Sequence, residues 1–95
     1  MEMPPYHPPK KYSVRIEGHR TSISLEPLFW EMLSTAAALR GQSINSLVAE
    51  IDAERIRSET PPGLAGAIRI WLVTRELEKK ETVKPRSPLD GPMNR

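Results

Sequence analysis

One short segment of this 95-residue chain places a guanidinium and two hydroxyls at alternate positions. Residues 20–25 read Arg-Thr-Ser-Ile-Ser-Leu, and a β-strand directs alternate side chains to opposite faces. One face of this strand then carries Arg20, Ser22 and Ser24, and the other face is apolar enough to cover a core. Arginine can donate two parallel hydrogen bonds to O6 and N7 of guanine, and serine can donate or accept at several bases. The polar face therefore predicts base contacts in a DNA groove.

The elements that must position this strand occupy the middle of the chain. Seven of the ten prolines lie at positions 4, 5, 8, 9, 85, 88 and 92, so residues 1–11 and 81–95 are predicted to be disordered tails. The remaining unit, residues 12–80, is one domain with a thin core. A single strand leaves both of its edges unpaired, and a second copy of the chain is an obvious pairing partner. We therefore expect a homodimer.

Three helices are predicted after the strand. The first begins near Pro27, which suits the first helical position, and ends at Arg40, with Gly41 as its left-handed cap. The second begins after Ser43, whose hydroxyl can cap it, and fades by Ser58. The third runs from about residue 64 to residue 80. The apolar residues expected to form the core of the dimer are Ile23, Leu25, Phe29, Leu33, Leu47, Val48, Ile51, Ile68, Trp71 and Leu72.

The third helix carries a second apolar stripe, formed by Gly66, Ile70, Val73 and Leu77. A helix that is apolar on two sides is in contact with two surfaces. In so short a chain, we expect the second surface to belong to another subunit.

The order of strand, helix, tight glycine turn and helix over residues 20–51 resembles the ribbon-helix-helix fold of the Arc and MetJ repressor class. The stretch 18–26, Gly-His-Arg-Thr-Ser-Ile-Ser-Leu-Glu, is similar to small bacterial proteins with a ribbon-helix-helix domain. This resemblance implies a mostly α fold with one short β-strand. It also implies an intertwined homodimer, whose antiparallel intersubunit β-ribbon enters the major groove, with the third helix as an addition.

The resemblance also implies which residues contact DNA. Arg20, Ser22 and Ser24 of each chain would face the bases, with Arg20 contributing about 1–3 kcal/mol of discrimination. Helix N-termini bind anions through free backbone N–H groups, and the family clamps a phosphate at the position that corresponds to Ser43, Ile44 and Asn45. Further phosphate contacts are expected from Lys10, Lys11 and Arg15.

Residues 12–17, Tyr-Ser-Val-Arg-Ile-Glu, also alternate and leave two possibilities open. They are either a basic arm that follows the DNA backbone or the first strand of a hairpin with Gly18 and His19 in a type II′ turn. In that hairpin Tyr12 would face Leu25, Val14 would face Ile23 and Ile16 would face Thr21. Such a hairpin would widen the ribbon of a dimer to four strands, which a major groove about 12 Å wide would admit poorly.

Composition and charge exclude several classes of function. Net charge is only +2, and residues 1–25 carry four basic groups against two acidic ones. The chain has no cysteine and no long apolar run, which excludes thiol chemistry and predicts a cytoplasmic protein. No catalytic, cofactor or metal motif is found: His7 and His19 are far apart, and Glu50, Asp52 and Glu54 point in different directions on a helix.

We therefore expect a non-enzymatic transcriptional regulator, a repressor or autoregulator that binds double-stranded DNA as a homodimer. Two alternatives stay open. One is an antitoxin whose segment after Lys80 binds a toxin. The other is a dimeric protein-interaction adaptor that does not bind DNA, which a hairpin between residues 12–17 and 20–25 would favour.

Overall fold

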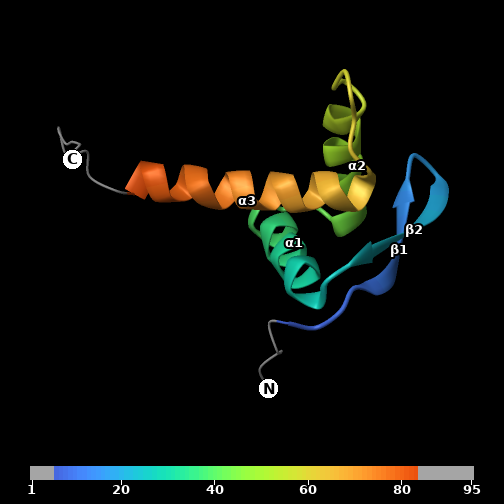
Figure 1. The fold of residues 1–95 in the computed structure, drawn as a ribbon, viewed down its shortest axis with the longest axis horizontal. Helices are drawn as coiled ribbons and strands as arrows, with labels where there is room; N and C mark the ends of the chain where they lie inside the picture. Colours follow the sequence, from blue (N-terminus) through green and yellow to red (C-terminus); the bar gives the residue numbers. More distant parts are fainter. Residues whose placement is uncertain (1–5, 84–95) are drawn as a thin grey trace.

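A β-hairpin and three helices make up the fold (Figure 1). The computed structural model describes residues 6–83, with side chains described as far as Lys80. The elements in chain order are β1 (Lys10–Ile16), β2 (His19–Leu25), α1 (Pro27–Leu39), α2 (Ile44–Arg55) and α3 (Leu64–Val83). Figure 1 shows α3 crossing both α1 and α2, with the hairpin beside the N-terminal end of α3. The long third helix thus packs against both other helices and against β2.

Residues 12–16 lie in the first strand of the hairpin and Glu17 begins its turn, which excludes the extended arm. β1 and β2 pair antiparallel within one chain, so the expectation of one short strand is wrong. A lone strand needs a partner for its backbone groups, and the preceding alternating segment of the same chain supplies it. Lys10 and Lys11, expected in the tail, are the first residues of β1.

The turn of the hairpin is Glu17-Gly18 and not the expected Gly18-His19. Both residues have positive φ, 50° for Glu17 and 83° for Gly18, as in a type I′ turn, whose twist matches that of the flanking strands. The predicted register is therefore wrong by two residues: Tyr12 faces Ile23, Val14 faces Thr21 and Ile16 faces His19. A shift of two residues leaves every side chain on its expected face.

The ends of the first two helices follow the predicted signals. Pro27 begins α1, and Gly41 adopts φ +69° after its end. The amide of Gly41 donates to the carbonyl of Ala38 at 3.1 Å and that of Gln42 to the carbonyl of Ala37 at 3.0 Å, which is the Schellman arrangement. The hydroxyl of Ser43 accepts a hydrogen bond from the amide of Ser46 at 3.0 Å and caps α2.

The core lies between the hairpin and the three helices. Most of the residues expected to form the core of a dimer are buried within this single chain, and Phe29 and Trp71 are half-buried. The first strand adds to this core, because Val14 is buried and Tyr12 and Ile16 pack against the cluster that the three helices form with β2. Tyr12 also stacks on Trp30 with 4.1 Å between the ring centroids. The chain thus covers its apolar face with its own β1.

An ion pair connects α3 to the start of α1. Nε of Arg69 donates to a carboxylate oxygen of Glu26 at 2.9 Å. The hydrogen bond from Arg69, aided by the backbone amide of Glu26, lowers the pKa of this carboxyl below its ordinary value of 4.5. The pair joins residues 43 positions apart in the sequence.

We expect Gly41→Ala to reduce the free energy of unfolding by about 1 kcal/mol, because an alanine side chain is disfavoured at positive φ. A Cβ at position 41 would meet no other atom within 4 Å, so the loss reports the backbone conformation and not a clash. Urea denaturation measures it. Gly66→Ala is the comparison variant, because Gly66 lies inside α3 without a positive φ and an added Cβ would meet only the Cβ of Pro62, at 3.8 Å; a Gly41→Ala variant as stable as this one would contradict the assignment.

The Arg69–Glu26 pair predicts a pH dependence of stability. Because the folded pKa of Glu26 is lowered, its contribution is fully present above the unfolded value and is lost as the pH falls through the folded value. Glu26→Gln should therefore be less stable than the wild type at pH 7, and the difference should shrink below about pH 4.5. Thermal melts at a series of pH values measure this. Glu31→Gln is the control, and a difference that stayed constant from pH 7 to pH 3 would contradict the prediction.

Candidate nucleic-acid interface

The outer face of the hairpin, defined here as the face turned away from the core, is basic and polar. The register pairs Lys11 with Ser24, Ser13 with Ser22, and Arg15 with Arg20. All six side chains are exposed. They comprise three cations and three hydroxyls, without a carboxylate. This face therefore offers hydrogen-bond donors and positive charge on a surface two strands wide.

Arg15 and Arg20 lie directly opposite each other on the outer face. Side chains at such positions have Cβ atoms about 4.5–5.5 Å apart, and like charges placed there destabilise the pair of strands. Neither guanidinium forms an ion pair with another residue in the part of the chain that the structure describes. An anion between the two arginines would remove this repulsion, so the pair favours a negatively charged ligand.

The structure assembles part of the predicted site on this face. Arg20, Ser22 and Ser24, the expected base contacts, lie together on β2. Lys11 and Arg15, expected at phosphates, lie beside them on β1, whereas Lys10 lies opposite Leu25 in the register and not on the outer face. Ser13 is also on the outer face and was missed by the sequence reasoning. The alternation of residues 12–17 was the signal that could have found it.

The N-terminus of α2 lies against the outward edge of β1. The side-chain oxygen of Asn45 accepts a hydrogen bond from the backbone amide of Arg15 at 3.0 Å. This bond shows that the amide of Arg15 points away from β2, as expected for alternate residues of an antiparallel ladder. The side chain of Asn45 therefore attaches the helix to the hairpin.

Two backbone N–H groups at the start of α2 donate no hydrogen bond within the described part of the chain. The amides of Ser46 and Leu47 are satisfied by the hydroxyl and the carbonyl of Ser43. Among the described residues no acceptor is found for the amides of Ile44 and Asn45. Such N–H groups at a helix N-terminus suit a phosphate. The predicted phosphate clamp thus lies next to Arg15, but the side chains of Ser43 and Asn45 act there as internal hydrogen-bond acceptors.

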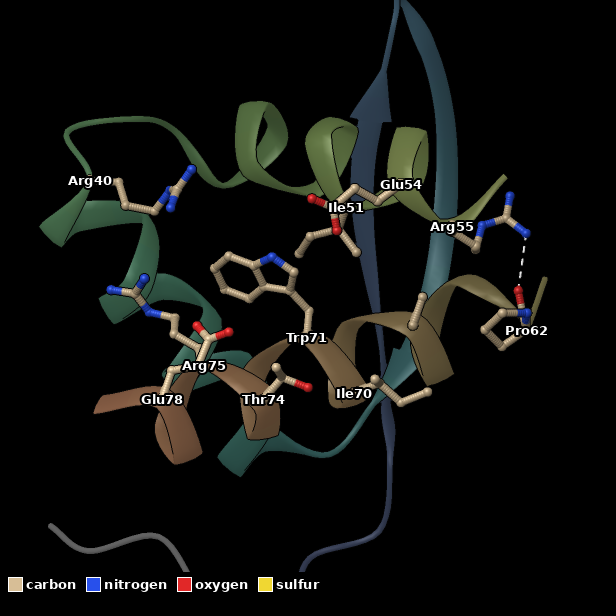
Figure 2. A pocket seen from close by; sticks show the side chains of 11 residues that line it. Arg40, Ile51, Glu54, Arg55, Pro62, Ile70, Trp71, Thr74, Arg75 and Glu78 are labelled. Atoms are coloured by element: carbon tan, nitrogen blue, oxygen red, sulfur yellow. Dashed lines mark hydrogen bonds between the residues drawn. The ribbon is translucent and has the colours of Figure 1, made fainter. Parts of the chain in front are cut away.

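A pocket of about 520 Å³ between α2 and α3 is a separate feature. Figure 2 shows Trp71 at its centre, with the hairpin behind the two helices. The guanidiniums of Arg40 and Arg75 lie 5.7 Å and 5.5 Å from the centroid of the Trp71 ring.

Carboxylates offset the positive charge of this pocket. Arg40 pairs with Glu50 at 3.0 Å and Arg55 with Asp52 at 2.8 Å. Glu54 and Glu78 also line the pocket. It lacks the uniform positive charge of the outer hairpin face and is therefore not the better candidate for binding an anion.

Neither a metal site nor a membrane span is found in the described part of the chain. No group of three or more His, Asp or Glu side chains there could hold a metal ion. None of its helices is long and apolar enough to cross a membrane.

The comparison with known families agrees with this architecture. The model of the ribbon-helix-helix domain family matches residues 9–75, which is more than half of the chain. The chain therefore belongs to the ribbon-helix-helix domain family. This is a non-enzymatic fold whose members are in general DNA-binding regulators and antitoxins. No curated protein and no solved structure matched the chain.

The contact between Asn45 and Arg15 predicts a measurable loss of stability. Asn45→Ala removes the acceptor for the Arg15 amide and should lower the free energy of unfolding by about 0.5–1.5 kcal/mol. Asn45→Asp keeps an acceptor in the same place and should lose less. Chemical denaturation of the two variants compares them; an aspartate variant as unstable as the alanine variant would show that the hydrogen bond contributes little.

Proposed function

We propose that this protein is a sequence-specific DNA-binding transcriptional regulator, a repressor or autoregulator, that contacts DNA with the outer face of its hairpin. The observation that carries the proposal is the Arg15–Arg20 pair, placed side by side on a face without carboxylates. The polyanionic DNA backbone supplies the charge that this pair lacks. Membership of the ribbon-helix-helix family supports the same conclusion.

Each part of the face has a distinct role in this proposal. Arg20 reads guanine through two parallel hydrogen bonds, and Ser22 and Ser24 contact neighbouring bases. Lys11 and Arg15 lie on the adjacent strand and contact phosphates, which position the protein without reading sequence. The amides of Ile44 and Asn45 bind a further phosphate beside Arg15.

A second copy of the chain pairs through β2 in this proposal. The register leaves the backbone groups of Arg20, Ser22 and Ser24 pointing away from β1. Within the described residues, β2 pairs with no strand other than β1. Antiparallel pairing of two β2 strands would give the intersubunit ribbon of the family, flanked on each side by a β1. The two-fold symmetry of such a dimer matches a palindromic DNA site.

The hairpin also favours a second candidate function, a dimeric protein-interaction adaptor. Four paired strands span three spacings, about 14 Å between the outermost backbones, whereas the major groove is about 12 Å wide. A sheet of that width would contact the sugar-phosphate backbones on both sides of the groove and would not enter it unless its outer strands bent away. The adaptor would use the same outer face to bind an acidic protein surface.

The antitoxin alternative depends on the segment after Lys80. Side chains beyond Lys80 lie outside the described residues, so no contact of the structure bears on it.

Binding to DNA should be salt-dependent and should depend on Arg20 for sequence preference. Duplexes enriched from a random pool supply a site, and fluorescence anisotropy compares that site with a scrambled duplex at several salt concentrations. We expect Arg20→Ala to reduce the preference for the site by about 5- to 150-fold, which corresponds to about 1–3 kcal/mol.

Arg57→Ala is the matched control, because Arg57 is an exposed arginine beyond the end of α2 and off the hairpin. It removes the same charge and should keep the preference. Wild-type protein that binds the site and the scrambled duplex equally well would contradict base reading. Absence of any salt-dependent binding would contradict DNA binding altogether and would favour the adaptor.

A further inference from the structure

Helix α3 has a second apolar face that no described part of the chain covers. Ile70, Val73 and Leu77 keep 59%, 46% and 59% of their surface exposed. On a helix with 3.6 residues per turn these residues lie on average about 150° from the buried Ile68 and Leu72. Figure 1 shows the C-terminal part of α3 extending beyond α1 and α2. The exposed stripe is thus opposite to the core and in part beyond it.

We propose that a second copy of the chain packs on this face, with the two α3 helices antiparallel and a two-fold axis passing close to Val73. In an antiparallel pair centred there, Val73 meets the partner's Val73, and Ile70 meets the partner's Leu77. Gly66 meets the partner's Lys80, and its missing side chain allows close approach. All six large apolar side chains of the two stripes are then buried against each other.

The charges next to the stripe are complementary in the same arrangement. Arg69 lies one residue before Ile70 and Glu76 one residue before Leu77, on the same flank of the stripe. Around an axis at Val73, Arg69 comes opposite the partner's Glu76, and symmetry repeats the contact. Within its own chain Glu76 is paired through Oε2 with Lys79 at 3.6 Å, and its other carboxylate oxygen can accept from Arg69 of the second copy. Arg69 uses its Nε for Glu26, and its two Nη groups stay suitable for a second carboxylate.

This complementarity favours a second copy over an unrelated partner. An isologous interface must be self-complementary, and the stripe provides apolar against apolar at its centre and opposite charges at its flank. The stripe is on α3 and the outward edge of β2 is on the hairpin, so a substitution in one leaves the residues of the other unchanged. Three large apolar residues per chain make the α3 interface smaller than a standard interface of about 800 Å² per partner. We expect association in the micromolar range.

A charge-swap pair at the axis tests the proposal. Val73→Glu and Val73→Lys each place two like charges face to face across the axis, and each should weaken self-association at least about tenfold by sedimentation equilibrium. A mixture of the two variants places glutamate opposite lysine and should associate more tightly than either variant alone. Ala53→Glu, at an exposed position on α2, is the control and should associate as the wild type does.

Three further experiments separate the possible failures. Melting curves by circular dichroism check that the variants fold, and Leu77→Gln, a neutral change on the same stripe, should also weaken association. Ser22→Pro removes an outward amide of β2 but none of the hairpin ladder, and it tests the β2 edge without touching α3. A wild-type monomer at all concentrations, unchanged association of the Val73 variants, or no recovery in the mixture would each overturn the proposal.

Discussion

The pairing of β1 with β2 is the constraint on which the rest of this structure depends. Through this pairing, the backbone N–H and C=O groups of β2 that point toward β1 find hydrogen-bond partners. The pairing also brings Val14 into the core and places two rows of polar side chains on one outer face. The pairing in turn depends on a two-residue turn with positive φ at Glu17 and Gly18. A turn one residue longer or shorter would displace the alternation of one strand relative to the other.

Two long-range polar contacts hold the helices to the hairpin in a defined way. The Asn45–Arg15 hydrogen bond joins the start of α2 to the outward edge of β1, and the Arg69–Glu26 pair joins α3 to the end of β2. One partner of each contact, Asn45 or Glu26, lies at a helix terminus or directly after a strand. The first contact places the N-terminus of α2 beside the basic face, and such an N-terminus favours anion binding.

Local signals predicted much of the fold. Pro27, Gly41 and Ser43 mark helix ends through their own backbone and side-chain preferences, so α1 and the start of α2 agreed with expectation. The alternation of residues 20–25 assigned Arg20, Ser22 and Ser24 to one exposed face. The register was wrong because Gly18 can occupy either position of a two-residue turn, and glycine alone does not distinguish them. Ser13 joined the site only through that pairing.

The sequence by itself determined which side of each element is apolar, because side-chain order and the periods of strand and helix are local properties. Only the tertiary structure decided which surface covers each apolar side. Most of the residues expected to form the core of the dimer are buried inside one chain, because β1 extends the sheet beside β2 and the three helices pack on its apolar face. The second stripe of α3 stays exposed, because α3 packs against the core with its other side, which carries Ile68 and Leu72. Burial depends on contacts between distant segments, and a periodic pattern does not specify which segments meet.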